Sequence, residues 1–346
     1  MRKNIDGDLC HRLLAEEAKP ALAFREDVSL ASQIGAAKEK LAELLGMKRI
    51  RDNICPLNID VEEELSGEGY RGIRFTFDSE TGATVPAYLL VPTDGEGPFP
   101  VVICLQGHTG GFHHSIGEIK SEKDAAFQPR ACHAHQALER GFAALAIEQR
   151  AMGERQSPLY PNPTVHACAI SALTALNLGR TTIGERVFDV SRSIDALEEM
   201  ADPRLDLSRI MLVGHSGGGT ATYYASCLEE RIGLSAPAGG FCSYSDSIMS
   251  IHHCVCNYIP DIVNWFEMGD LSMLVAPRSL VILTGEYDGI FPIEGVRAEF
   301  DRVKRIYKAA GAPGACSLAV SKEHHVFSTE VFWDAITKEA KRLGWF

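Results

Sequence analysis

The run GHSGG at positions 214–218 is the strongest chemical signal in the sequence. It follows the apolar run RIMLV, which is typical of a strand, and it precedes a run with helical character. A strand, Gly-x-Ser-x-Gly and a helix in that order predict a nucleophile elbow, a strained turn that exposes the hydroxyl of Ser216 at the edge of a sheet. Side chains two positions before and after the serine would collide in such a turn, so glycine is expected at Gly214 and Gly218.

An acid and a histidine that could activate Ser216 follow it in the chain. A serine hydroxyl is a weak nucleophile and needs a base that a third group orients. With this elbow the chain order is serine, acid, histidine. Asp288, in the loop after the apolar run SLVILT, is the expected acid, and Glu286 of the same turn is the alternative. The adjacent His324 and His325 follow the last apolar run, and one of them is the expected base.

Two backbone N–H groups are also expected, because the negative oxygen that forms during attack on a carbonyl must be stabilised. One belongs to Gly217, directly after the serine. The other is assigned to His108, in the glycine-rich loop QGHTGG that follows the apolar run VVICL. Glycine allows the close approach of a backbone to a ligand that such an oxyanion hole requires.

The elements around these residues predict an α/β fold of the α/β-hydrolase type. Apolar runs alternate with helical runs, which is typical of a mostly parallel, doubly wound sheet covered on both faces. The apolar runs are 101–105, 142–148, 209–213, 279–284 and 315–320, and the helical runs are 129–140, 183–200, 217–229, 295–310 and 329–343. Before them, RGIRFTF and TVPAYLLVP flank a polar turn and predict an antiparallel hairpin.

The chain is expected to have two parts. Residues 1–65 are polar, and 29–47 shows helical spacing after a serine cap, so an N-terminal helical arm is expected on the outside of the sheet. Residues 66–346 are expected to form the catalytic domain. Within it, the connection 150–182 is too long for a plain crossover and is expected to form part of the wall of a substrate pocket.

Several motifs together resemble the acetyl xylan esterase and cephalosporin-C deacetylase-like hydrolases, within the group related to dienelactone hydrolase. The resemblance runs from the predicted hairpin to the C-terminus, and the order of the motifs makes it more specific than any one of them. The motifs are LQGHTGG at 105–111, EQRAMGER at 148–155, GHSGGG at 214–219, CNYIP at 256–260, APR at 276–278 and GEYDGIFP at 285–292.

The resemblance selects one of the two histidines. In such proteins the base often stands in a pattern like Gly-x-His-x-Phe, which His325 fits and His324 does not. This chain departs from the family at Glu323, which replaces the glycine, and at Gln106, where family members usually have histidine. Because the oxyanion donor is a backbone amide, Gln106 is compatible with the same chemistry. The resemblance also implies acetylated sugars as substrates.

Composition excludes several classes of function. The 346-residue chain has a formal net charge of −12 and no basic run, whereas nucleic-acid binding needs clustered Lys and Arg. No apolar run reaches the roughly 18 residues that span a bilayer, so no membrane partner is expected. The N-terminus lacks the apolar segment of a signal peptide, so a cytoplasmic location is expected. A homo-oligomer is compatible with the sequence.

The run HHCVC at 252–256 contains residue types that bind zinc. Its spacing has no second separated pair, and the family motif accounts for the segment, so no metal site is expected. His113 and His114, near the oxyanion loop, are expected at a loop surface.

These residues predict a serine hydrolase that cleaves small carboxylic esters, acetyl esters above all, through an acyl-enzyme and without a cofactor. Two alternatives remain open. A peptidase of the prolyl-oligopeptidase type uses the same triad, but a propeller-length N-terminal domain is missing here. A catalytically inactive hydrolase fold used for binding would not need Ser216, Asp288 and His325 intact and in order.

Overall fold

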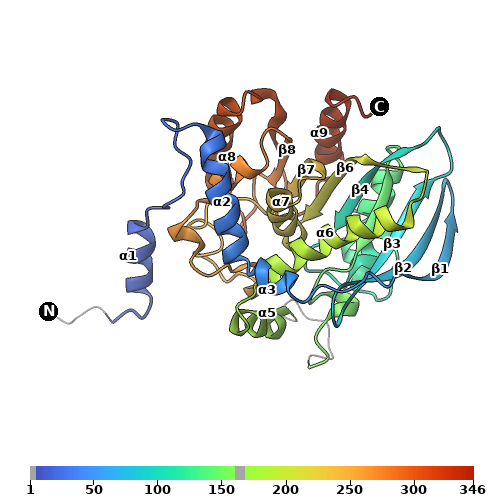
Figure 1. Ribbon diagram of the computed structural model, residues 1–346, viewed down its shortest axis with the longest axis horizontal. Helices are drawn as coiled ribbons and strands as arrows, with labels where there is room; N and C mark the ends of the chain where they lie inside the picture. Colours follow the sequence, from blue (N-terminus) through green and yellow to red (C-terminus); the bar gives the residue numbers. More distant parts are fainter. Residues whose placement is uncertain (1–4, 160–167) are drawn as a thin grey trace.

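A mixed sheet of nine strands forms the centre of the computed structural model, which describes residues 5–159 and 168–346 (Figure 1). The strand order is β1-β2-β3-β5-β4-β6-β7-β8-β9. The pairs β1–β2, β2–β3 and β3–β5 are antiparallel, and every later pair is parallel. The sheet therefore has the mostly parallel character and the N-terminal antiparallel part that the sequence predicts.

The strands are β1 (Asp60–Gly67), β2 (Tyr70–Glu80), β3 (Ala83–Pro92), β4 (Phe99–Leu105), β5 (Ala143–Ile147), β6 (Leu205–His215), β7 (Ile232–Ala238), β8 (Ser279–Gly285) and β9 (Cys316–Ser321). The α-helices are α1 (Leu9–Glu17), α2 (Leu30–Leu44), α3 (Met47–Arg51), α4 (His133–Leu138), α5 (Cys168–Asn177), α6 (Thr182–Met200), α7 (Gly217–Leu228), α8 (Ile293–Ala309) and α9 (Thr329–Arg342). Among the described residues, no helix is both long and apolar enough to cross a lipid bilayer.

Each face of the sheet has its own hydrophobic core. Successive side chains of a strand point to opposite faces. On β4, Val101, Ile103 and Leu105 join one core, while Val102 and Cys104 join the other. Helices α2, α3, α6, α7 and α8 cover the first face, and α4 and α9 cover the second. The central strands are apolar throughout because both of their faces are buried.

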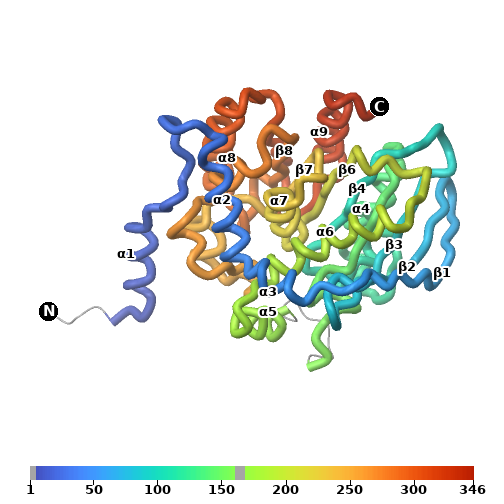
Figure 2. The backbone as a smooth tube through the Cα atoms, in the orientation of Figure 1, coloured from blue at the N-terminus to red at the C-terminus, as the bar shows by residue number. Residues whose placement is uncertain are grey.

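The N-terminal arm packs outside the sheet through α2 and α3. Helix α2 buries Ala37 and Leu41, and α3 buries Met47 and Ile50, all in the first core. Helix α1 buries no side chain. The trace in Figure 2 shows the arm running along the side of the molecule that carries α7 and α8.

The predicted C-terminal boundary of the helical arm, at residue 65, is wrong. Residues 60–65 were expected to belong to a helical segment, but they form most of β1, which pairs with β2 at the edge of the sheet. Seven of the eight β1 residues are exposed, so the strand carries no alternating apolar pattern. Its three consecutive glutamates, which favour helices, instead keep an exposed edge charged.

Strand β7 was not predicted. Its sequence, IGLSAPA, is poor in the β-branched and aromatic residues that mark strands, yet it lies in the parallel part of the sheet between β6 and β8. Small residues are needed there because α7 packs very closely on it. A side chain on Gly219 would overlap the carbonyl oxygen of Ala238.

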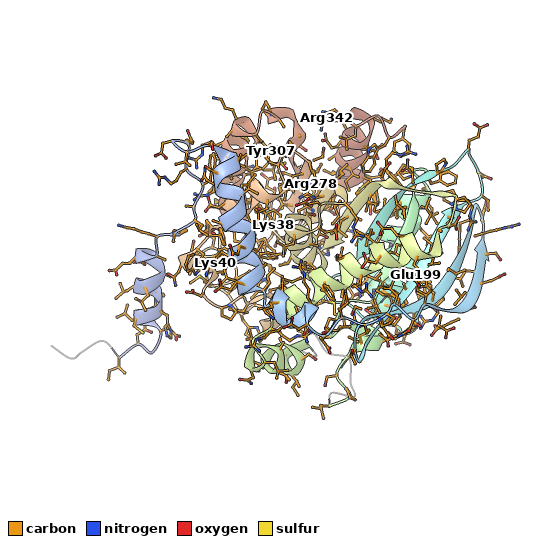
Figure 3. All side chains as sticks on the ribbon, in the orientation of Figure 1. Lys38, Lys40, Glu199, Arg278, Tyr307 and Arg342 are labelled. Atoms are coloured by element: carbon orange, nitrogen blue, oxygen red, sulfur yellow. The ribbon has the colours of Figure 1, made fainter. Side chains whose placement is uncertain are left out.

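The APR motif has a structural role. Arg278, labelled in Figure 3, donates hydrogen bonds to the carbonyl oxygens of Ser226 and Glu229 at the end of α7 and of Ile232 at the start of β7. Tyr307 of α8 in turn donates to the Arg278 carbonyl at 2.7 Å. The last carbonyls of a helix have no partner within the helix, so this arginine fixes the connection that follows the elbow helix.

A buried ion network holds the EQRAMGER motif against α6 and β2. Asp189 accepts from Arg150 at 2.8 Å and from Arg155 at 2.6 Å. Glu80 accepts from Arg150 at 2.9 Å and also from Arg180. Although burial alone would raise it, the charges of Arg150 and Arg155 hold the pKa of the Asp189 carboxyl below its usual range. Removing one partner would leave an unpaired buried charge.

Thr181 caps α6 and also holds the arm. Its hydroxyl oxygen accepts from the Gly184 N–H at 2.9 Å, and the hydroxyl donates to the Leu45 carbonyl at 3.1 Å. We expect Thr181→Ala to lower the free energy of unfolding by about 1–2 kcal/mol, since both bonds are lost. Thr181→Ser keeps the hydroxyl and should retain most of the stability. Urea denaturation of the three proteins checks this, and equal losses in the two variants would contradict it.

Candidate active site

Ser216 occupies the sharp turn between β6 and α7. Its backbone has φ 57° and ψ −120°, a conformation that residues other than glycine rarely adopt. Its N–H donates to the Ala238 carbonyl at 2.8 Å, and its carbonyl accepts from the Thr220 N–H at 2.9 Å. The turn therefore belongs both to the sheet and to the first turn of α7, and it leaves the serine hydroxyl in a cavity.

The glycines of the elbow allow backbones to touch. A side chain on Gly214 would overlap the backbone of Gly218, and one on Gly218 would overlap the carbonyl oxygen of Leu105 on β4. The structure thus shows the crowding from which the sequence analysis required glycine at both positions.

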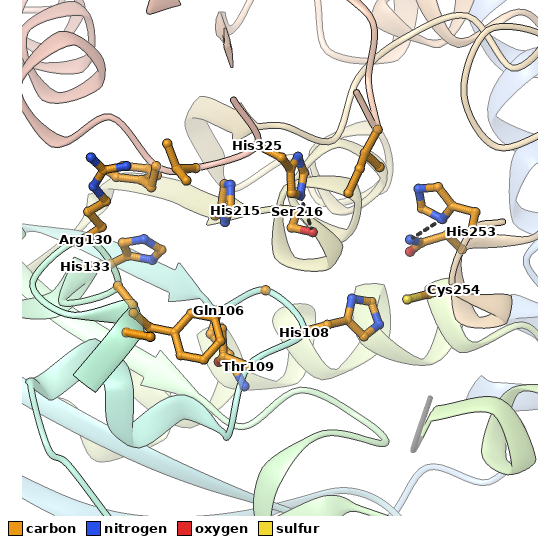
Figure 4. A pocket seen from close by; sticks show the side chains of 18 of the residues that line it. Gln106, His108, Thr109, Arg130, His133, His215, Ser216, His253, Cys254 and His325 are labelled. Carbon is orange, nitrogen blue, oxygen red and sulfur yellow. Dashed lines mark hydrogen bonds between the residues drawn. The ribbon is translucent and has the colours of Figure 1, made fainter. Parts of the chain in front are cut away.

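His325 connects Ser216 to Asp288, and Figure 4 marks the hydrogen bond between His325 and Ser216. The Ser216 hydroxyl is 2.8 Å from Nε2, and Nδ1 is 2.8 Å from Oδ2 of Asp288. The other oxygen of Asp288 accepts from the N–H groups of Ile290 at 2.8 Å and Phe291 at 3.0 Å. These bonds fix the carboxylate, which then fixes the imidazole with Nε2 toward the serine. This is the arrangement that a nucleophile, a base and an orienting acid require.

The two alternatives from the sequence lie elsewhere. His324 is exposed, and its Nδ1 is 3.0 Å from the Tyr287 carbonyl oxygen. The acid that contacts His325 is Asp288 and not Glu286. The structure therefore brings His325 and Asp288 to Ser216.

The predicted oxyanion donors, His108 and Gly217, lie close to each other. Within the described residues, the N–H groups of His108 and Gly217 have no hydrogen-bond acceptor. The His108 imidazole packs directly over Gly217, where an added Cβ would lie 2.7 Å from its Cε1 atom. The two amides thus belong to segments that touch each other beside the serine.

Glu148 supports the oxyanion loop and was not singled out in the sequence as a functional residue. It is fully buried, and it accepts from the Gln106 side chain and from the N–H groups of Phe112 at 3.2 Å and Glu154 at 3.1 Å. Burial raises the pKa of its carboxyl to about 7. The side chain of Gln149 donates to the Gln106 carbonyl. The EQRAMGER motif, which contains Glu148 and Gln149, was the sequence signal that could have pointed to this supporting role. Both of these side chains contact Gln106.

The cavity beside Ser216 has a volume of about 430 Å³. Figure 4 shows Arg130 and His133 on one side of Ser216 and His253 and Cys254 on the other. The residues that line the cavity are Gln106, Gly107, His108, Thr109, Ala126, Phe127, Arg130, Ala131, His133, His215, Ser216, His252, His253, Cys254, Asn257, Ile290, His325, Val326 and Phe327.

The connection 150–182 was expected to form part of the pocket wall, but none of its described residues lines this cavity. Cys168 and Ala172 of α5 pack instead against Cys256 and Ala151, behind the lining segment. Residues 160–167 lie outside the described part of the chain. The lining that was expected from this connection comes from 126–133 and 252–257.

His113 and His114 are buried, so their expected place at a loop surface is wrong. Their Nε2 atoms each lie 3.2 Å from a different oxygen of Asp124. Asp124 also accepts from the N–H groups of Lys120 and Ser121, both at 2.8 Å. The two histidines therefore do not face solvent. Through Asp124 they stabilise the loop that follows β4.

Comparison with known proteins places the chain in a family. A family model named Abhydrolase_7 and described as an Abhydrolase family matches residues 6–335. The chain belongs to the Abhydrolase_7 family. The Bacillus subtilis protein YtaP, assigned as a hydrolase, is 25% identical over 252 residues, which are 71% of this chain and 79% of YtaP.

Solved structures share the fold of this Abhydrolase_7 member. A Bacteroides fragilis protein assigned as an acetyl xylan esterase has a TM-score of 0.79 and 16% identity, covering 97% of this chain and 95% of that one. A glucuronoyl esterase from Solibacter usitatus has a TM-score of 0.65 and 17% identity, covering 93% and 96%. Acetyl xylan esterase 1 from Thermoanaerobacterium has a TM-score of 0.60 and 15% identity, covering 96% of this chain and 98% of that one. The predicted α/β-hydrolase fold and the predicted resemblance are confirmed.

The hydrogen bonds of Ser216 predict how three variants behave. Ser216→Ala and His325→Ala should each lower kcat by roughly 10³-fold to 10⁴-fold or more, because the three groups act as a unit. His324→Ala, which removes an exposed neighbour, is the matched control and should keep most of the activity. Steady-state kinetics with a chromogenic acetyl ester, with a thermal melt of each variant, checks this. A His324→Ala enzyme that is inactive while His325→Ala survives would reverse the assignment.

Proposed function

We propose that this protein is a serine esterase that hydrolyses small acyl esters through an acyl-enzyme. The observation that carries the proposal is the continuous relay Ser216–His325–Asp288, with both hydrogen bonds at 2.8 Å, on the wall of a cavity. Structures named as acetyl xylan esterases and glucuronoyl esterases share the fold, which supports an ester substrate.

The proposed reaction uses only groups of this chain. The Ser216 oxygen attacks the ester carbonyl while His325 Nε2 takes the hydroxyl proton. The N–H groups of His108 and Gly217 stabilise the negative oxygen. His325 returns the proton to the leaving alcohol, which departs. A water molecule then attacks the acyl-enzyme while His325 takes its proton, and His325 returns that proton to Ser216 as the acid leaves. Asp288 keeps Nε2 free to accept the proton and stabilises the imidazolium.

Three other histidines that line the cavity, His133, His215 and His253, have lowered pKa values, which favours their neutral form and limits repulsion of this imidazolium. Burial lowers the pKa of His133 and that of His253 to about 4. Burial also holds the pKa of His215 well below its usual value, and its ring centroid lies 4.9 Å from that of His325. A charged imidazole at that distance would disfavour protonation of His325 during the reaction.

The cavity wall is suited to an oxygen-rich alcohol. Arg130, Thr109 and Asn257 are among the polar residues that line it, and the Arg130 side chain is 49% exposed. A guanidinium donates readily to hydroxyl oxygens, and structures named as acetyl xylan esterases share the fold. We therefore propose an acetylated carbohydrate as the substrate class.

The first test of this proposal is a series of p-nitrophenyl esters from acetyl to octanoyl. We expect kcat/KM to be highest for acetyl and to fall with chain length, because a long alkyl chain would cover the polar atoms of the wall without pairing them. A fluorophosphonate probe should label Ser216, and it distinguishes an active enzyme from an inactive fold. A steady rise in activity toward octanoyl, or no labelling, would contradict the proposal.

The second test concerns His133, which lines the cavity from α4. His133→Leu should raise KM for an acetylated xylo-oligosaccharide several-fold, because it makes that part of the wall apolar, and leave KM for p-nitrophenyl acetate nearly unchanged. His135→Leu is the control on the same helix, because the His135 ring faces Tyr70 and the Ile116 carbonyl. Equal effects of His133→Leu on both substrates would count against a sugar subsite here.

A further inference from the structure

Three cysteines and a histidine meet behind the oxyanion loop. Cys168 stands at the start of α5, Cys254 and Cys256 flank the start of the short 3-10 helix η4 (Val255–Asn257), and His108 follows β4. Ligand atoms of His108, Cys168 and Cys254 lie within 4.8 Å of one another. The Cys256 sulfur is 3.0 Å and the Cys168 sulfur 3.7 Å from Nε2 of His108. We call these four residues the thiol cluster.

A buried cation faces the thiol cluster. Arg186 of α6 is 1% exposed. Its Nε and one terminal nitrogen donate to the Arg150 carbonyl, and the other terminal nitrogen lies 3.4 Å from the Cys256 sulfur. Within the described residues, no carboxylate forms an ion pair with it. A buried guanidinium is stabilised by a nearby negative charge, and Arg186 is positioned to offset the charge of thiolates that bind a metal ion in this cluster.

The cluster has the donors of a zinc site, and three of its four ligand atoms, those of His108, Cys168 and Cys254, lie within 4.8 Å of one another. Zinc prefers thiolate sulfur at about 2.3 Å and imidazole nitrogen at about 2.0–2.1 Å in a tetrahedron, which puts nitrogen and sulfur about 3.5 Å apart. The distances from His108 Nε2 to the two sulfurs, 3.0 and 3.7 Å, bracket that value. Three thiolates and a neutral imidazole would leave a zinc site with one negative charge, which Arg186 balances.

We propose that the thiol cluster binds one zinc ion, with Cys168, Cys254, Cys256 and His108 as ligands. The ion would join the oxyanion loop to α5 and η4 by fixing the His108 imidazole, and so would position the His108 N–H. It takes no part in the reaction steps, and the site rests on the cluster itself rather than on the proposed esterase activity. The spacing of 252–256 alone does not predict it, because His108 and Cys168 come from distant parts of the chain.

Metal content and optical spectra test the proposal directly. Protein purified from zinc-supplemented medium should contain about one zinc per chain, and cobalt(II) exchanged into it should give thiolate charge-transfer and tetrahedral ligand-field bands. Cys168→Ser and Cys254→Ser should lose the zinc and weaken the cobalt bands. Cys227→Ser is the matched control, because Cys227 is buried in α7 and bonds to the Leu271 carbonyl, outside the cluster.

Activity provides a second readout. Zinc removal should lower kcat on the order of tenfold with little change in KM, since a displaced oxyanion donor weakens transition-state stabilisation, and zinc should restore it. Stoichiometric zinc in a protein without esterase activity would support the site and refute the proposed function. Zinc-free protein with no cobalt bands would overturn the site, as would a chain 2 Da lighter that carries a disulfide from Cys168 to Cys254 or Cys256.

Discussion

The backbone turn at Ser216 is the constraint on which the rest of the site depends. A non-glycine residue with φ 57° is strained by about 1–3 kcal/mol, and such strain persists only where the surroundings enforce it. Here the surroundings are three backbones in direct contact: β4 against Gly218, β7 against Gly219 and the elbow itself. Because no side chain fits between them, the backbone of the turn is tightly constrained, and it places the Ser216 hydroxyl at hydrogen-bond distance from His325.

The parallel arrangement of the strands brings the remaining groups to the same edge of the sheet. His108 follows β4, Ser216 follows β6, Asp288 follows β8 and His325 follows β9. The carboxyl ends of parallel strands meet at one edge, which is where open α/β sheets bind ligands. Each of these four residues is thus placed near the others by the strand before it, and the loop that carries it sets its final position. The hydrogen bonds of Asp288 with the N–H groups of Ile290 and Phe291 do this for the acid.

The parts predicted from the sequence are those with a strong local signal. The apolar central strands and the elbow are read from neighbouring residues, and the chain order of Ser216, Asp288 and His325 follows from the fold. The parts that were missed depend on contacts between distant segments. Strand β7 is made of small residues that suit its neighbours rather than its own strand propensity. Glu148 and Cys168 acquire their surroundings only when other segments fold against them.

The position of His325 has a consequence for the time at which the site forms during protein synthesis. His325 is 109 residues beyond Ser216 and follows β9, the last strand of the chain and an edge strand of the sheet. A ribosome-bound chain that has already formed the elbow lacks the imidazole, and its serine stays an ordinary alcohol. The hydrogen bond between Ser216 and His325 can form only after β9 has paired with β8, so the elbow by itself holds an incomplete relay until this edge strand is in place.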